Sequence, residues 1–385
     1  MSTASERKLR IGVAGLGRAF AVMLPTFKAD PRVSLVAAAD TRAEARQRFA
    51  EEFSANAYTT VEELCADPAV EVIYVATPHQ WHARHAALAA QHRKHLLIEK
   101  PMALTLQECA AIIDAARGGG VHLVVGHSHS FDAPVRHLRG LIDSGRYGNA
   151  RMINAINYTD YLYRPRRPEE LDTALGGGAI FNQAAHQIDI VRLLGGGRVA
   201  SVRAATGAWD RTRPTEGAYA ALLTFENGVF ASLTYSGYGN FDSDEFQGWI
   251  GEMGQKKDPR AHGLARKTLA GGKNELLIKK SRNYGGKDFK PTKASAYQHF
   301  GVFVVSCEQA DLRPLPHGVM IYGDREKRLE RLPKPRVPRA EVIDELYGAV
   351  VEGRAPLHSG ESAMATLQVC LAMLESARLQ KEIVL

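Results

Sequence analysis

Short apolar runs alternate with helically spaced apolar residues over the first 126 residues of the chain. An apolar run of about four to eight residues between turn residues is typical of a buried strand, and apolar residues three and four apart are typical of a covering helix. Their alternation predicts βαβ units around a parallel sheet. The predicted strands are Leu9–Ala14, Ser34–Ala39, Val70–Ala76, Leu96–Glu99 and Leu123–Gly126, with helices over 18–29, 42–53, 61–65, 81–90 and 106–116.

Beyond residue 127 the pattern changes to strands that follow one another directly, and Glu226-Asn227-Gly228 is a strong hairpin signal between two of them. The chain is therefore predicted to be α/β, with an N-terminal doubly wound parallel sheet over 1–126 and a C-terminal α+β domain over 127–385, whose open sheet is mostly antiparallel. Residues 251–295 read as an irregular, basic insertion, and Arg313–Arg339 is proline-rich. The predicted elements are strands Ala150–Tyr158, Val199–Ala208, Tyr219–Glu226 and Val229–Ser236 and helices over 134–144, 176–194, 339–352 and 360–379.

Composition and length fit two globular domains. The chain has 385 residues, 45% of them hydrophobic and 24% charged, and a domain takes roughly 150 residues. No apolar stretch reaches the roughly 20 residues of a membrane span, and the first residues do not resemble a signal peptide. The 4 cysteines are widely spaced, so neither disulfides nor a thiolate zinc site are expected. We therefore expect a cytoplasmic protein without a membrane partner.

The positive charge is concentrated in the insertion. Residues 256–293 hold twelve Lys or Arg and three acidic residues, which gives this segment a charge of +9 in a chain of net charge +7. Such a segment could be a solvated loop or could attract an anionic ligand. Few aromatic residues accompany the charges, so stacking on nucleic-acid bases is not expected.

A glycine-rich turn lies between the first predicted strand and helix, in the sequence Ile-Gly-Val-Ala-Gly-Leu-Gly-Arg-Ala-Phe of residues 11–20. Gly15 permits the tight turn, and Gly17 lets the backbone approach a pyrophosphate at the helix amino end. Phe20 replaces the usual third glycine, so helix and strand should pack slightly farther apart. The turn predicts dinucleotide binding.

Asp40 ends the second predicted strand, 25 residues after Gly15. A carboxylate there accepts hydrogen bonds from the adenosine ribose and repels a 2′-phosphate, which favours NAD over NADP. Alternatively, Asp40 caps the following helix. Arg42 could also pair with a phosphate.

Lys100 follows a predicted strand and precedes Pro101 in the sequence Ile-Glu-Lys-Pro of residues 98–101. The carboxyl end of such a strand is where open α/β sheets bind ligands. A lysine there is too costly to bury for packing alone, so it needs a partner or a chemical task.

Three histidines follow Thr77-Pro78, namely His79, His82 and His85. Their spacing could suggest a metal site, but the third lies off the helical face and no acidic residue is close in sequence. A wall of the cofactor site or a helix surface is the interpretation we favour, and we expect no metal.

A second polar cluster occurs in the segment 176–189, where three glycines precede a helix. Asn182 and His186 are four residues apart, so they would project from one helical face. Asp189 could orient the His186 ring. A His and an Asn on one helix can also be ordinary buried polar groups, and it is the pairing with Lys100 that favours a functional interpretation.

The glycine turn, the strand end at Thr77-Pro78, Glu99-Lys100-Pro101 and the glycine-rich segment with His186 together resemble the Gfo/Idh/MocA oxidoreductase family. Within it, the chain is similar to the phthalate dihydrodiol dehydrogenase branch. The resemblance implies an N-terminal Rossmann domain, a C-terminal domain whose open sheet often mediates oligomers, and NAD(P) as cofactor. It also implies that Lys100 and His186 are catalytic.

The chain departs from the family pattern at two places. Asn182 stands where polyol dehydrogenases commonly have Asp, and His127 and His129 replace a loop of Asn-Arg type. We expect Lys100, His186 and Asn182 to be catalytic. The expected cofactor residues are Gly15, Gly17, Arg18, Ala19, Phe20, Asp40, Arg42, Thr77, Pro78, His79, His82, Glu99, Lys100 and Pro101, and the expected substrate residues are His127, Tyr163, Arg164, Arg166, Asn182 and His186.

The expected activity is NAD-dependent oxidation of an anionic cyclic diol, in particular cis-4,5-dihydro-4,5-dihydroxyphthalate, by a homodimer or homotetramer. Arg164 and Arg166 could clamp the substrate carboxylates bidentately, or be solvated loop charges. The base could be Lys100 or His186. Alternatives are a sugar or inositol dehydrogenase of the same family and a non-catalytic protein that senses NAD.

Overall fold

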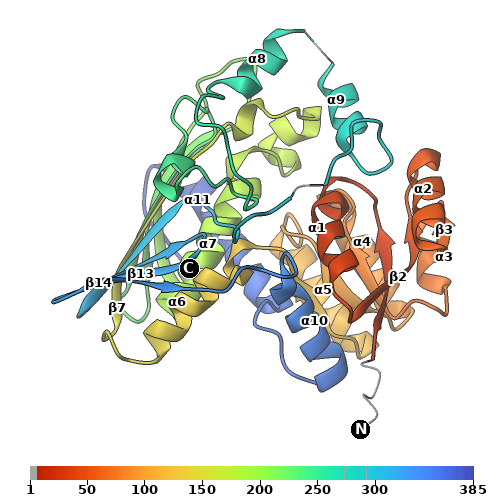
Figure 1. Ribbon diagram of the computed structural model, residues 1–385, viewed down its shortest axis with the longest axis horizontal. Helices are drawn as coiled ribbons and strands as arrows, with labels where there is room; N and C mark the ends of the chain where they lie inside the picture. The colour runs from red at the N-terminus through yellow and green to blue at the C-terminus, as the bar shows by residue number, and fades with distance from the viewer. Residues whose placement is uncertain (1–6, 273, 292) are drawn as a thin grey trace. The chain divides into compact units, whose positions relative to one another are not determined.

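The computed structural model describes residues 7–272, 274–291 and 293–385 (Figure 1). These residues form two compact units. Unit 1 contains residues up to 127, together with residues between 277 and 292 and the segment 336–364. Unit 2 contains the rest, and no helix in the described ranges is long and apolar enough to cross a membrane. The predicted N-terminal domain ended at residue 126 and did not include the later segments that belong to unit 1.

Unit 1 is built on a parallel sheet in the order β3-β2-β1-β4-β5-β6. Strands β1, β4, β5 and β6 are mostly buried, as the predicted βαβ pattern requires, and the parallel doubly wound sheet is confirmed. The order reverses between β1 and β4, and ligands bind at the carboxyl ends of strands beside such a reversal. The strands are β1 (Leu9–Ala14), β2 (Val33–Ala39), β3 (Asn56–Tyr58), β4 (Val72–Val75), β5 (His95–Ile98) and β6 (Leu123–Val125).

Two helices of unit 1 carry clear capping signals. Thr60 and Thr105 each form a capping box with the glutamate three residues later. Gly120 ends α5 in the left-handed region, where glycine has no steric penalty. The helices are α1 (Arg18–Ala29), α2 (Ala43–Phe53), α3 (Val61–Ala66), α4 (His82–Gln91), α5 (Leu106–Gly119) and α10 (Ala340–Glu352), and η1 (His79–Trp81) precedes α4.

Unit 2 contains a mostly antiparallel sheet, as predicted, in the order β14-β13-β12-β11-β7-β10-β9-β8-β15. Among the described strands of this sheet, β7 and β10 are the parallel pair. The helices α6 and α7 contact one of its faces (Figure 1). The strands are β7 (Ala150–Tyr158), β8 (Val199–Gly207), β9 (Ala218–Phe225), β10 (Phe230–Ser236), β11 (Val302–Cys307), β12 (Ala310–Leu315), β13 (Gly318–Gly323), β14 (Lys327–Arg331) and β15 (Ile383–Val384).

The sequence pattern did not predict strands β11 to β14. β11 and β13 do carry apolar runs, at residues 302–305 and 319–322, but these runs are short and lie beside segments that look irregular or are rich in proline. Pro314 lies inside β12. A proline argues against a strand because it has no N–H to donate to a neighbouring strand.

The remaining helices are short, apart from α11. The region predicted as irregular contains α8 and α9 between its loops. The helices are α6 (Ala133–Asp143), α7 (Ala185–Gly195), α8 (Leu264–Ala270), α9 (Glu275–Arg282) and α11 (Gly360–Leu379), with short helical turns η2 (His129–Phe131), η3 (Tyr161–Tyr163), η4 (Pro168–Leu171), η5 (Thr173–Leu175), η6 (Ile180–Ala184) and η7 (Ser243–Gln247).

Candidate active site

The glycine turn after β1 has the geometry that a pyrophosphate requires. Gly15 has φ +97°, and a Cβ atom there would lie 2.9 Å from the Ala76 carbonyl oxygen. Gly17 is the N-cap of α1, and a Cβ atom on it would have no atom within 4 Å. The backbone at the amino end of α1 is thus open to a ligand, so these residues fit the diphosphate of NAD. Phe20 is fully buried, so any cofactor contact from this residue comes from its backbone.

Asp40 is held at the carboxyl end of β2 by donors around the turn. Its carboxylate accepts hydrogen bonds from Leu16 N at 2.7 Å and from Arg42 N at 2.8 Å. Arg42 also donates from Nε at 3.1 Å. Arg42, and not Asp40, is the N-cap residue of α2, so the helix-cap alternative for Asp40 is not what the structure shows.

His82 links the loops that follow β4 and β5. The ring is fully buried, with Nε2 2.9 Å from Thr77 O and Nδ1 3.1 Å from Pro101 O. Burial lowers the pKa of His82, in spite of the carbonyl partners, which favour the charged ring. The neighbouring His85 lies 3.0 Å from Thr77 Oγ1, and burial lowers its pKa to about 4. His82 and His85 thus contact backbone and hydroxyl oxygens of the neighbouring loops, and a place for them in the wall of the cofactor site stays a prediction.

Lys100 lies half-buried directly after β5, next to a carboxyl group. Burial raises the pKa of that group, Glu99, while the hydroxyl of Tyr74, which donates to it, and the charge of Lys100 oppose the rise. Glu99 therefore gives the Lys100 charge a nearby acidic neighbour in a low-dielectric setting. This is the kind of partner that the cost of placing a lysine at a strand end requires.

In unit 2, Asn182 lies in a π-helical turn that directly precedes the regular helix carrying His186. The turn η6 runs into α7, which begins at Ala185. The amide nitrogen of Asn182 donates to Gly176 O at 3.1 Å and to Gly178 O at 3.0 Å, so the side chain closes the glycine-rich turn. The prediction of one continuous α-helical face for Asn182 and His186 is therefore wrong in detail, because a π-turn changes the angular register.

His186 is buried among rings. The His129 ring lies 4.9 Å from it at 72°, and the Phe300 ring lies 4.9 Å from it at 44°. His129 Nδ1 is 2.7 Å from Asp132 Oδ2, so this second histidine is oriented by a carboxylate. His129 and Asp132 are not among the site residues that the sequence predicts. The spacing of three residues between them was a signal, but their approach to His186 depends on the fold.

Asp189 lies one turn after His186. Its carboxylate accepts hydrogen bonds from the Ser130 hydroxyl and from Thr366 Oγ1 at 3.3 Å. These bonds join α7 to the loop before α6 and to α11, which supports the helix that carries His186. The suggestion that Asp189 orients His186 stays a prediction.

The predicted substrate residues after β7 are held by protein partners. Tyr163 donates to Asp210 at 2.6 Å, and Arg164 donates to Asp160 at 2.8 Å and to Glu252 at 3.2 Å. Burial would raise the pKa of Glu252, but the Arg164 charge and other polar neighbours hold it below its ordinary value.

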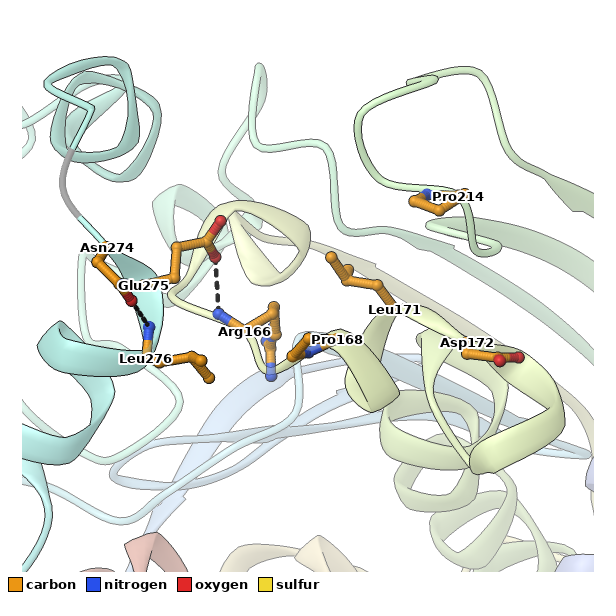
Figure 2. A pocket seen from close by; sticks show the side chains of 8 residues that line it. All are labelled: Arg166, Pro168, Leu171, Asp172, Pro214, Asn274, Glu275 and Leu276. Atoms are coloured by element: carbon orange, nitrogen blue, oxygen red, sulfur yellow. Dashed lines mark hydrogen bonds between the residues drawn. The ribbon is translucent and has the colours of Figure 1, made fainter.

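Arg166 borders a cavity of about 760 Å³ in unit 2 (Figure 2). Its guanidinium group lies 3.8 Å from the centre of the Tyr161 ring and donates to Tyr161 O at 2.7 Å. Glu275, on another wall, accepts from the backbone of Arg166 at 2.8 Å and pairs with Arg213 at 2.9 Å. Arg166 and Glu275, which line this cavity, therefore both have partners within the protein. His127, the remaining predicted substrate residue, is buried in the loop after β6 of unit 1.

The comparisons with known proteins agree with this architecture. The family model described as oxidoreductase family, NAD-binding Rossmann fold, matches residues 9–127, and the model of the GFO/IDH/MocA C-terminal domain matches residues 135–250. The chain belongs to the Gfo/Idh/MocA oxidoreductase family. It is therefore an oxidoreductase with an NAD-binding domain, as predicted.

Among relatives of this Gfo/Idh/MocA protein, the 1-carboxy-3-chloro-3,4-dihydroxycyclohexa-1,5-diene dehydrogenase of Comamonas testosteroni is 48% identical over 96% of this chain and 95% of its own length. The trans-1,2-dihydrobenzene-1,2-diol dehydrogenase of Danio rerio is 32% identical over 48% of this chain and 57% of its own. A crystal structure of a proposed dehydrogenase from Bordetella bronchiseptica RB50 matches with a TM-score of 0.94 and 42% identity, covering 98% of this chain and 100% of that chain.

Proposed function

We propose that this oxidoreductase oxidises a carboxylated ring diol with NAD, and that its substrate is cis-4,5-dihydro-4,5-dihydroxyphthalate, which yields 4,5-dihydroxyphthalate. The observation that carries the proposal is the 48% identity over 96% of the chain to a dehydrogenase named for a carboxylated dihydroxycyclohexadiene. The anionic ring diol that the sequence suggested belongs to the same chemical class.

The reaction removes a hydride and a proton from one carbinol group. NAD, held by the glycine turn after β1 and by Asp40, would supply the hydride acceptor for the carbinol carbon. The hydroxyl proton passes to a protein base as the carbon–oxygen double bond forms. The ketone then tautomerises to the aromatic catechol, which makes the oxidation strongly favourable.

Lys100 and His186 are the two proposed bases. An ordinary lysine has a pKa near 10.4 and is a poor base at neutral pH. For Lys100 to act as the base, burial and the positive nicotinamide ring must outweigh the neighbouring Glu99, which favours the ammonium form. His186 is the alternative, and the His129 ring beside it is oriented by Asp132. Asn182, whose amide nitrogen holds the glycine turn, is proposed to bind a substrate hydroxyl through its carbonyl oxygen.

The residues after β7 are proposed to recognise the substrate carboxylates. Arg164 is held between Asp160 and Glu252, so a carboxylate of the substrate must compete with these acceptors. Binding of the substrate carboxylate is therefore expected to depend on Arg164 and on the strength of its ion pair with Glu252. Tyr163, Arg166 and His127 remain proposed contributors.

The test is a comparison of kcat/KM, followed by NADH absorbance, for the phthalate dihydrodiol, the chlorinated monocarboxylate named above, an uncarboxylated benzene dihydrodiol, inositol and glucose. We expect the carboxylated diols to lead by about a hundredfold or more, because a site built for a polar group discriminates strongly against its absence. Within this class, the phthalate diol should lead.

Preference for inositol or glucose would contradict the proposal and support a sugar or inositol dehydrogenase. Binding of NAD without NADH formation from any substrate would also contradict it and support an NAD-sensing protein. A shift of labelled DNA at physiological salt would reveal a nucleic-acid role for the basic insertion, which the proposal excludes.

A further inference from the structure

A segment of the basic insertion packs against the adenosine end of the nucleotide-binding unit. Tyr284 is fully buried in unit 1, although it lies far along the chain from the residues that surround it. The edge of its ring meets the Phe20 ring at 5.1 Å, and its hydroxyl donates to Glu52 at 2.6 Å. The Arg48 guanidinium lies 5.0 Å from the centre of the Tyr284 ring. These contacts fix the segment on α1 and α2.

The backbone of the same segment reaches Arg42, beside Asp40, the residue proposed to bind the ribose. The Tyr284 carbonyl oxygen accepts a hydrogen bond from Arg42 Nη1 at 3.0 Å. Gly285 has φ +82°, and a Cβ atom there would lie 2.9 Å from Ala45 Cα, at the first turn of α2. Glycine at this position therefore permits the approach that brings the Tyr284 carbonyl to Arg42.

Arg42 consequently has its donors committed within the protein. Nε and Nη2 donate to the two oxygens of Asp40 at 3.1 and 3.2 Å, and Nη2 also donates to Leu16 O at 2.8 Å. With the bond to Tyr284, four of about five guanidinium N–H groups are used. A guanidinium group in this state cannot form the bidentate pair that a 2′-phosphate of NADP needs unless it leaves these acceptors.

We propose that the segment around Tyr284 is a positioning element that makes the enzyme selective for NAD against NADP. It holds Arg42 on Asp40, so that the carboxylate stays in place for the ribose and the guanidinium group is withheld from a 2′-phosphate. Phe20, the residue in place of the third glycine, provides the apolar surface on which Tyr284 rests. The proposal depends on NAD as cofactor and not on the identity of the ring diol.

The experiment measures the dissociation constants of NADH and NADPH by titration of the full chain, without substrate. The variants are Tyr284→Ala, Arg42→Ala, the double variant, and Lys287→Ala as a control, because Lys287 is exposed in the same segment. In Tyr284→Ala, the ratio of the NADPH to the NADH dissociation constant should fall about tenfold, because the released Arg42 can bind the phosphate. Lys287→Ala should leave the ratio unchanged.

The double variant separates positioning from general destabilisation. If Tyr284 acts through Arg42, then Tyr284→Ala should not change the ratio further in the Arg42→Ala background. An equal change in both backgrounds would overturn the proposal. Circular dichroism shows whether Tyr284→Ala folds. If it does not, Glu52→Gln weakens the hydrogen bond from the Tyr284 hydroxyl, because a charged acceptor becomes neutral. That variant should lower the ratio by about threefold. A ratio unchanged in the variants that fold would also overturn it.

Because no substrate is present, failure of this experiment leaves the ring-diol proposal intact. Conversely, failure of the substrate comparison leaves this selectivity intact.

Discussion

Lys100 stands where burial and charge oppose each other. Lys100 follows the carboxyl end of β5. The neighbouring Glu99 accepts a hydrogen bond from the Tyr74 hydroxyl. A residue at the end of a strand is recognisable from sequence because the apolar run that precedes it is unambiguous. For that reason the sequence alone places Lys100 and Asp40 at the carboxyl ends of predicted strands. His129 was missed because its neighbours His186 and Phe300 come from distant parts of the sequence.

Lys100→Ala tests whether this amine takes part in the chemical step. We expect kcat to fall by about 10²- to 10⁴-fold, the usual contribution of a general acid–base group. The dissociation constant of NADH, measured by fluorescence titration, should stay within about threefold of wild type, because an interaction used only in the transition state does not affect ground-state binding. Lys8→Ala, at an exposed position, serves as the matched control. Unchanged turnover in Lys100→Ala would exclude this residue from the mechanism.

Asp244 is a buried carboxyl group whose titration should be visible in stability. Burial and the nearby Glu252 charge raise the pKa of Asp244 to about 7, although Lys257 Nζ donates to it at 2.8 Å and opposes the rise. An aspartate in the unfolded chain titrates near 3.9, so the folded state binds this proton more tightly. The stabilising contribution is therefore complete at low pH and is lost as the pH rises through about 7.

Asp244→Asn should accordingly raise the melting temperature relative to wild type more at about pH 8 than at about pH 5. The change removes a charge that is costly to bury, and part of the gain is offset by loss of the Lys257 pair. Thermal unfolding at the two pH values is the measurement. Asp258→Asn, at an exposed surface position, should not show such a pH-dependent difference. An identical shift at both pH values for Asp244→Asn would contradict the assignment.

At the scale of elements, the sequence predicted continuously buried strands such as β4 and also alternating strands such as β7 and β10. Every residue of β4 is buried, so its apolar run was unmistakable. The strands β11 to β14 were not predicted, because they lie between a segment that looks irregular and one that is rich in proline, and β12 itself contains a proline. The π-turn η6 was read as ordinary helix because five residues are too few to establish a different period. Chain segments that join unit 1 from residues 277 onward were beyond prediction, since only tertiary contacts place them there.

The glycine turn ahead of η6 is expected to tolerate no side chain at one position. Gly178 has φ +78°, and a Cβ atom would overlap the Glu216 carboxylate and the Thr215 hydroxyl. Gly178→Ala should lower the free energy of unfolding by about 2–4 kcal/mol through steric overlap and backbone strain.

Gly118→Ala is the matched control, because Gly118 lies inside α5 and a Cβ atom on it would have no atom within 4 Å. Alanine there should be neutral or stabilising by about 0.5–1 kcal/mol, since it reduces the entropy of the unfolded chain. Urea denaturation of both variants measures the difference. Equal stability of the two variants would contradict the proposed constraint at Gly178.

At the scale of the whole molecule, the sheet of unit 2 has a face with exposed apolar side chains. Ile156 in β7, Leu222 in β9 and Phe230 in β10 are 41, 47 and 43% exposed. Strand register places them on the same face. Ile156 pairs with Thr234 of β10 and Leu222 pairs with Ser232 of β10, and both partners lie an even number of residues from Phe230. An apolar face of this kind in a stable protein is typical of an interface between copies. The predicted homo-oligomer would use it.

Leu222→Glu tests this prediction by placing a charge in the face. We expect light scattering coupled to gel filtration to show a smaller species than wild type, because an unpaired buried charge opposes association. Leu264→Glu, which changes an exposed leucine in α8, should leave the mass unchanged. Wild-type mass for Leu222→Glu would contradict this use of the face.

The way unit 1 is assembled from separated segments has a consequence for biosynthesis. As the ribosome extends the chain, residues 7–127 emerge first, but the piece with Tyr284 and the helix α10 follow only after most of unit 2. The nucleotide-binding unit therefore cannot acquire all its contacts until residue 364 has left the tunnel. A truncated product that ends at residue 127 would leave the Phe20 and Phe49 surface without its aromatic cover, and it should require chaperone binding to stay in solution.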